Sequence, residues 1–239
     1  MRIKIALSSL SLAILFLSGC GLLPPTFSVR VDSIGSSSAD KKTYQLLPGN
    51  KDVKADDLQF KEYAAYVHRA LFKQGFVPAE SFEKASVGIF LSYGIGEPTE
   101  HQYSYSTNTY GQTGVSSSRT TGRVSPGGSV STTTTYTPKY GKIGETSHIG
   151  TYTTYSRYMI LDAVDLDEYR KSEKEVQLWK TTVTSTGSSS DLRLVFPILV
   201  AASSQYIATN TGKKIKVELY ENDAQVKEIK SIANEKIQP

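Results

Sequence analysis

The segment from residue 101 to residue 157 constrains the fold most, because its composition differs sharply from that of the rest of the chain. It consists mainly of Ser, Thr, Tyr and Gly, with few aliphatic residues, five basic residues and one acidic residue. Such a segment buries too little apolar surface to form a core of its own. Its Thr and Tyr content favours strands, and Ser125-Pro126-Gly127-Gly128 favours a turn. We therefore expect either a long polar β-hairpin that pairs along an existing sheet or a disordered insertion.

The sequence on both sides of this insertion has the periodicity of strands and helices. Alternation of apolar and polar residues, or a short apolar run, predicts six strands. They lie at residues 27–31, 42–47, 87–95, 158–164, 176–185 and 215–219. Helical spacing predicts two helices, at 56–74 and 192–206. The order β-β-α-β, insertion, β-β-α-β indicates an α+β (mixed α/β) domain, with a mainly antiparallel sheet and two helices packed on one face.

Residues at the helix ends support these two assignments. Asp56 or Asp57 can cap the first helix, and Gly75 can end it in the left-handed conformation. Ser190 or Asp191 can cap the second helix. Pro197 must either kink this helix or mark a later first turn.

The N-terminus has the pattern of a bacterial lipoprotein signal. Arg2 and Lys4 precede an apolar run that ends in Leu17-Ser18-Gly19-Cys20, which reads as a cleavage and lipidation box. We expect residues 1–19 to be removed and Cys20, the only cysteine, to carry a diacylglycerol and an N-acyl chain such as palmitate. Several acyl tails on one residue suffice for stable membrane anchoring. The lone cysteine also excludes an internal disulfide.

The residue after the cysteine suggests where the anchor resides. Gly21 stands where lipoproteins retained in the inner membrane usually have Asp, so we expect the periplasmic face of the outer membrane in a two-membrane cell. In a single-membrane cell, the same box would place the protein on the outer face of the plasma membrane. We interpret 20–26 as the lipidated tether, 27–220 as a single domain and 221–239 as a charged tail with helical spacing.

Net charge argues against nucleic acid as a partner. The precursor carries a formal charge of +4, and removal of the signal deletes two basic and no acidic residues, which leaves +2. Nucleic-acid-binding domains usually concentrate many more Lys and Arg residues on one face.

Four segments carry a resemblance to a known family: Lys42-Thr43-Tyr44-Gln45, residues 71–76, residues 158–164 and Leu178-Trp179-Lys180. Together with the order of elements, they make the chain similar to a family of bacterial lipoproteins catalogued as a domain of unknown function (DUF4136). The resemblance covers most of the mature chain outside 101–157, where this chain has a much longer polar stretch. It implies a mixed α/β lipoprotein domain facing the periplasm, and it transfers neither an enzyme activity nor a functional residue.

The common catalytic motifs are missing from this sequence. It has no Gly-x-Ser-x-Gly elbow, no phosphate-binding Gly-x-x-x-x-Gly-Lys loop and no His-Glu-x-x-His zinc motif. Gly94-Ile95-Gly96 lacks the third glycine and the following helix of a dinucleotide-binding motif, so we interpret it as a bulge or strand end. We therefore expect no enzyme activity and no cofactor.

Neither the histidines nor the acidic residues have the spacing of a metal site. His68, His101 and His148 lie far apart, and we interpret each as a solvated or core histidine. The densest acidic cluster lacks the central glycine and the distant bidentate Glu of a calcium loop, so we interpret it as a solvated hairpin turn. It comprises Asp162, Asp165, Asp167 and Glu168. We expect no metal.

The tyrosines of the insertion suggest recognition of a partner, because flat amphipathic rings beside small hydroxyl side chains give adaptable contacts. Our first hypothesis is a non-enzymatic scaffold or interaction module of the cell envelope, held on the membrane by its lipid, with envelope proteins as partners. The alternative is a protein that binds glycan, peptidoglycan or lipopolysaccharide through four tyrosines. These are Tyr103, Tyr105, Tyr136 and Tyr152. A third hypothesis, an envelope hydrolase, would need a pocket that unites Asp162, Asp165 and a histidine.

Overall fold

The computed structural model describes residues 26–35 and 42–231, so the lipidation box, with Cys20, lies outside the described residues. Within these ranges an eight-stranded sheet has the order β3-β2-β4-β6-β7-β1-β8, and β5 pairs with β6 alone. The strands are β1 (Thr26–Gly35), β2 (Thr43–Pro48), β3 (Val77–Pro78), β4 (Val87–Ile95), β5 (Thr99–Val124), β6 (Val130–Asp165), β7 (Gln177–Gly187) and β8 (Ile215–Tyr220). The helices are α1 (Leu58–Lys73), α2 (Leu166–Ser172), α3 (Leu192–Ser203) and α4 (Ala224–Lys230), with short 3-10 turns η1 (Phe82–Lys84) and η2 (Ser204–Tyr206).

The α+β class expected from the sequence is confirmed, but two details were wrong. The sheet is mixed, because β2 pairs in parallel with both β3 and β4. Helix α1 connects β2 to these strands, and a helical crossover returns the chain in the same direction, which produces parallel pairing. The described part of the chain also holds four α-helices, where we expected two on the sheet. Helix α4 lies in the tail that has helical spacing, and α2 was not expected. None of these helices has the length and apolarity that crossing a membrane requires.

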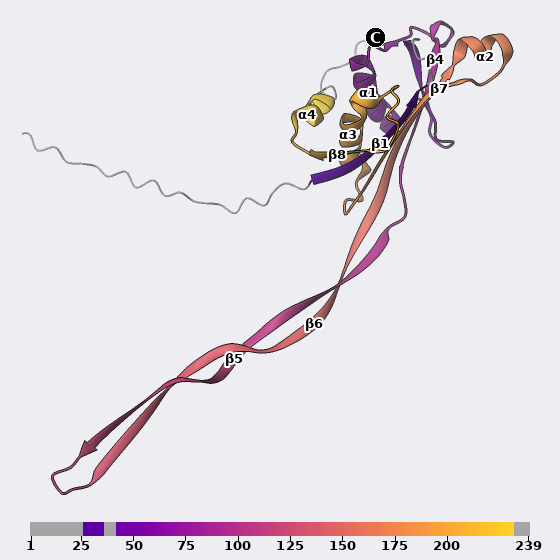
Figure 1. The fold of residues 1–239 in the computed structure, drawn as a ribbon. Coiled ribbons are helices and arrows are strands. Elements are labelled where there is room, and N and C mark those ends of the chain that lie inside the picture. Colours follow the sequence, from indigo (N-terminus) through magenta and orange to yellow (C-terminus); the bar gives the residue numbers. More distant parts are fainter. Residues whose placement is uncertain (1–25, 36–41, 232–239) are drawn as a thin grey trace, which may run out of the picture.

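Helices α1, α3 and α4 lie on one face of the sheet (Figure 1). The buried stripe of α1 packs on α3, where the rings of Tyr63 and Phe196 stack with their centroids 4.0 Å apart. Gly75 ends α1 with φ +78°, as expected. Asp57 is the N-cap residue, but its carboxylate accepts from the Lys54 backbone N–H instead of from the helix.

Helix α3 lies at the centre of the core and is buried from Val195 onward. Asp191 Oδ1 caps it by accepting from the Leu194 N–H at 3.2 Å. Pro197 lies inside the helix. The helix-facing residues of the central strands are fully buried in the same core, as in Leu91 of β4 and Leu161 of β6. Burying each of these leucines contributes roughly 1.5–3 kcal/mol.

The insertion forms an extended hairpin that projects far from the domain (Figure 1). Strands β5 and β6 pair from Thr99 with Thr154 to Val124 with Val130. The turn lies at the expected Ser-Pro-Gly-Gly sequence, where Gly128 has φ +81°. Strand β6 continues without a break from this hairpin into the centre of the sheet, where it pairs with β4 and β7. The domain sheet therefore supports the hairpin directly. We call the paired residues 99–124 and 130–154 the arm.

Candidate functional site

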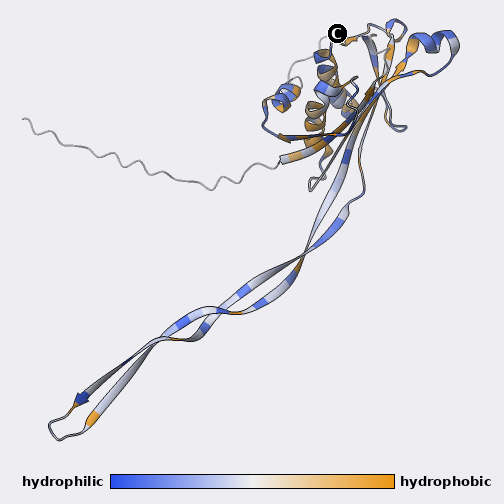
Figure 2. Cartoon of the chain, viewed as in Figure 1, coloured by the Kyte–Doolittle hydropathy of each residue, from blue (hydrophilic) through white to orange (hydrophobic). Residues whose placement is uncertain are grey.

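The arm is exposed along its whole length. None of residues 99–156, all of which the structure describes, is buried. Figure 2 shows mostly intermediate and hydrophilic colours along it, in contrast to the apolar interior of the domain. Since the arm consists of two strands only, the outer main-chain edge of each strand has no neighbouring strand among residues 26–35 and 42–231. Such edges are the sites at which another chain can add a strand.

Five aromatic side chains gather on one face of the arm near its base, and we call them the aromatic strip. They are His101, Tyr103, Tyr105, His148 and Tyr152. The register places His101 opposite Tyr152, Tyr103 opposite Gly150 and Tyr105 opposite His148. Alternate residues of a strand point to the same face, and direct opposites in a hairpin share that face. The strip is therefore a consequence of the strand register.

The outer members of the strip are two stacked pairs. The ring centroids of His101 and Tyr152 are 4.9 Å apart with an interplanar angle of 20°, and those of Tyr105 and His148 are 5.1 Å apart at 22°. Hydroxyl groups hold both imidazoles, because His101 Nε2 lies 2.8 Å from Thr154 Oγ1 and His148 Nε2 lies 2.9 Å from Thr107 Oγ1. These hydrogen bonds fix the orientation of each ring pair.

Tyr103 lies between the two pairs and covers Gly150. A Cβ atom placed on Gly150 would approach the Tyr103 Cζ to 2.6 Å and its Cε1 to 2.8 Å, so the ring lies across the glycine. Its centroid is 5.9 Å from that of Tyr105 and 6.1 Å from that of Tyr152. Tyr103 is nevertheless 50% exposed, which leaves the side of the ring away from the ribbon open to solvent.

The structure brings together three of the four tyrosines that the sequence suggested, and separates the fourth. Tyr136 pairs with Ser118 near the tip of the arm. Its sixteen-residue separation from Tyr152 along β6 corresponds to about 50 Å of extended strand. Tyr136 therefore does not belong to the strip. Sequence reasoning missed His101, His148 and Gly150, because only the pairing register places them beside the tyrosines.

His68 has a different role. Its Nδ1 lies 2.6 Å from the Tyr44 hydroxyl, between α1 and β2. Burial lowers the pKa of His68, and burial also raises the pKa of Tyr44 above its ordinary value, so the two form a neutral hydrogen-bonded pair. The groove whose lining contains Asp162 has no described histidine in that lining, whereas the hydrolase hypothesis required the two together.

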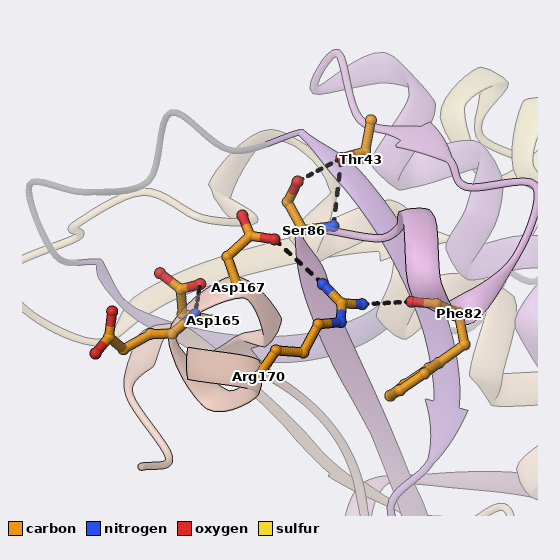
Figure 3. Close-up of polar contacts among 7 residues, drawn as sticks. Thr43, Phe82, Ser86, Asp165, Asp167 and Arg170 are labelled. Atoms are coloured by element: carbon orange, nitrogen blue, oxygen red, sulfur yellow. Dashed lines mark hydrogen bonds and ion pairs between the residues drawn. The ribbon is translucent and has the colours of Figure 1, made fainter. Parts of the chain in front are cut away.

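The acidic cluster starts helix α2, so the expected solvated hairpin turn was wrong there. Asp165 Oδ1 accepts from the Glu168 N–H at 3.0 Å, which is an N-cap contact. Asp167 and Glu168 lie in the first turn, where negative charges interact favourably with the positive end of the helix dipole. Figure 3 shows that Arg170 then joins α2 to η1. Its guanidinium pairs with Asp167 at 3.1 Å and donates to the Phe82 carbonyl at 2.5 Å. The cluster is structural in this arrangement.

Helix α2 and η1 border a groove of about 750 Å³ on the sheet face opposite the other helices. Leu91 and Ile89 point to the core, so Phe90 and Ser92 point into this groove. Its floor also contains Asp162, which accepts from Gln177 Nε2 at 2.6 Å and lies 3.6 Å from Lys180 Nζ. The groove is thus at the end of the sheet remote from the arm, with a mixed apolar and charged lining.

Comparisons with known proteins do not assign this chain to a family. No family model matches it, and no curated protein sequence is similar to it. Among solved structures, it is similar to a PDZ domain protein from Parabacteroides distasonis, with a TM-score of 0.38 and 12% identity over 82% of this chain. The alignment spans only 39% of that protein. The family resemblance described from the sequence therefore stays a prediction, and the arm with its aromatic strip is the candidate site.

Proposed function

We propose that this protein is a lipid-anchored, non-enzymatic interaction module of the cell envelope, and that the arm docks it to a protein partner. Cys20 would hold the protein on the periplasmic face of the outer membrane. The observation that carries the proposal is the arm, a two-stranded ribbon with no buried residue that is rooted in the central strand of the domain. A structure of this kind exposes a large surface without contributing to the core.

The physical argument rests on the open edges of the ribbon. An isolated two-stranded hairpin is marginally stable in water, because too few of its groups are covered. A third strand from a partner would satisfy the outward-facing main-chain groups and cover one side of the ribbon. The Thr-rich stretch 132–135 has high strand propensity and carries no charge, which suits such an addition.

The root of the arm is built to hold it in a defined direction. Arg157 lies in β6 where the arm enters the domain, and it is only 2% exposed. Its guanidinium donates to the Ser189 carbonyl at 3.0 Å and to Ser185 Oγ at 3.1 Å, and burial lowers its pKa. These bonds connect β6 to β7 and to the loop before α3. A firmly held root lowers the ordering cost when the arm meets a partner.

The test removes the outer arm and keeps its base. Replacing residues 110–143 with Asn-Gly lets the pair Thr109 and Gly144 close a two-residue hairpin turn. Crosslinking in intact cells, followed by mass spectrometry of the co-purified proteins, should then lose the partners that the full chain captures. Tyr103→Ala, with an arm of full length, is the matched control and should keep them. An unchanged set of partners in the truncated protein would contradict the proposal.

The anchor has a separate test. Cys20→Ser removes the acceptor of the lipid, so the protein should leave the membrane fraction and accumulate as a soluble or uncleaved form. Fractionation of cells that express each variant measures this. Equal membrane association of Cys20→Ser and of the unaltered protein would refute the anchor. It would leave the proposal for the arm intact.

A further inference from the structure

We propose that the aromatic strip is a binding site for a neutral chain of N-acetylhexosamines, the chemistry of the glycan backbone of peptidoglycan. The site uses a face of the ribbon near its base, whereas the docking proposed above uses the strand edges of the outer arm. Only the source of the ligand rests on the proposed envelope location; the binding itself does not.

The geometry of the rings suits a sugar. Tyr103 lies flat over Gly150 and presents the opposite side of its ring to solvent. The face of an aromatic ring carries partial negative charge, and the C–H bonds on one face of a pyranose ring carry partial positive charge, so the two pack together. The stacked pairs on both sides of Tyr103 border this platform along the strand direction. A saccharide chain can therefore lie along the ribbon with one sugar on Tyr103.

The polar groups around the rings match the remaining chemistry of such a sugar. Tyr103, Tyr105 and Tyr152 are each about half exposed, so their hydroxyl groups reach solvent beside the platform. A phenolic hydroxyl both donates and accepts hydrogen bonds. Sugar hydroxyl and acetamido groups require both functions.

The charges select a neutral ligand over an anionic one. Residues 101–107 and 146–154 contain no Asp, Glu, Lys or Arg. The neighbouring Glu100 and Glu145 lie on the opposite face of the ribbon, where Glu145 pairs with Lys142. The basic residues of the arm lie in its outer part, as with Arg119 and Lys139. The phosphate groups of lipopolysaccharide would find no cation within the strip, so a neutral N-acetylhexosamine chain fits better.

The same rings also stabilise the hairpin, since cross-strand aromatic pairs contribute about 0.2–1 kcal/mol each. The experiment must separate this role from binding. Gly150→Thr does so, because it keeps every ring and raises strand propensity, yet its Cβ would occupy the place of the Tyr103 ring. Gly122→Thr is the matched control, because the nearest atom to a Cβ there lies at an ordinary 3.6 Å.

The probe is a soluble β-1,4-linked tetramer of N-acetylglucosamine, titrated into the folded protein and followed by NMR. We expect binding by the full chain and by the protein whose residues 110–143 are replaced with Asn-Gly, which retains the strip. Tyr103→Ala and Gly150→Thr should each weaken binding at least tenfold. Gly122→Thr and Tyr140→Ala, the latter at a 70% exposed tyrosine outside the strip, should change it less than twofold.

Amide exchange of residues 101–105, measured on every variant, shows whether the hairpin remains formed. The proposal is overturned if the full chain does not bind the tetramer, if Gly150→Thr binds it normally with the hairpin intact, or if the control variants lose binding equally. Preferential binding of lipopolysaccharide over the tetramer would also overturn it. Loss of protein crosslinks in the truncated variant, with sugar binding retained, supports both proposals separately.

Discussion

Strand β6 belongs to two regions that differ in almost everything except backbone geometry. In the domain its alternate residues Met159, Leu161 and Ala163 are fully buried under the helices, whereas in the arm the same strand has no buried residue. The hydrogen-bond pattern is antiparallel in both regions. The comparison indicates that main-chain pairing and exposed cross-strand contacts maintain the ribbon, while burial of apolar surface stabilises the domain.

The largest expected difference comes from removing the same kind of side chain from each region. Leu161→Ala deletes a fully buried side chain and should lower the free energy of unfolding by about 2–5 kcal/mol. Ile149 lies on the same strand in the arm, and its side chain is 75% exposed. Ile149→Ala should therefore change the free energy of unfolding by no more than about 0.5 kcal/mol. Urea unfolding measures both. Similar losses would show that the arm belongs to the cooperative core.

A smaller effect is expected from a helix end, a type of contact that occurs only in the domain. Asp191→Ala removes the N-cap of α3 and should cost about 1 kcal/mol of unfolding free energy. The control on the arm is Thr120→Ala, which removes an exposed hydroxyl pair with Thr134 and should cost only a few tenths of a kcal/mol. Thermal unfolding compares the two variants, and an equal cost would contradict the distinction.

The buried His68 should make the stability of the domain depend on pH. Burial lowers its pKa in the folded state, so the unfolded chain takes up a proton first as the pH falls below the ordinary value of 6.5. This contribution to stability is present at neutral pH and is lost on acidification. Urea unfolding between pH 7 and pH 5 should show a smaller decline for His68→Asn than for the unaltered protein. An identical decline would contradict this assignment.

The smallest change is expected from truncating the arm. Replacing residues 110–143 with Asn-Gly removes no buried residue, so the free energy of unfolding of the domain should change by less than about 0.5 kcal/mol. The same variant tests partner capture above, which makes this measurement its folding control. A large loss of stability would show that the outer arm packs on the domain in solution.

Elements with strong local signals could be predicted, and elements that depend on long-range pairing could not. The apolar stripes of α1 and α3 identify both helices, because side chains three and four apart share a helix face. Helix α2 was missed because its short acidic segment resembles a turn, although Asp165 is a normal N-cap residue. The parallel pairing of β2 depends on where the crossover helix returns the chain, and local sequence does not encode that position.

The aromatic strip shows the same division at a single site. The composition and the turn sequence left a hairpin or a disordered insertion open, and the abundance of Tyr suggested recognition of a partner. Three irregularities in the pairing, between Thr109 and Tyr110, Gln112 and Gly114, and Val115 and Ser117, shift the register between tip and base. Continuing the register of the tip to the base would pair His101 with Thr153 instead of Tyr152. A shift of one residue turns a side chain to the other face, so the strip could not be inferred in advance.

The sequence by itself determined the lipoprotein signal pattern, the α+β class, the positions of two helices and the polar character of the insertion, because each depends on local composition or periodicity. Only the tertiary structure decided that β6 is both the centre of the sheet and one side of the arm, and that Tyr103 lies over Gly150 between two stacked ring pairs. These features arise from pairing between residues that are distant in the chain. The free energy of such pairing depends on the whole sheet.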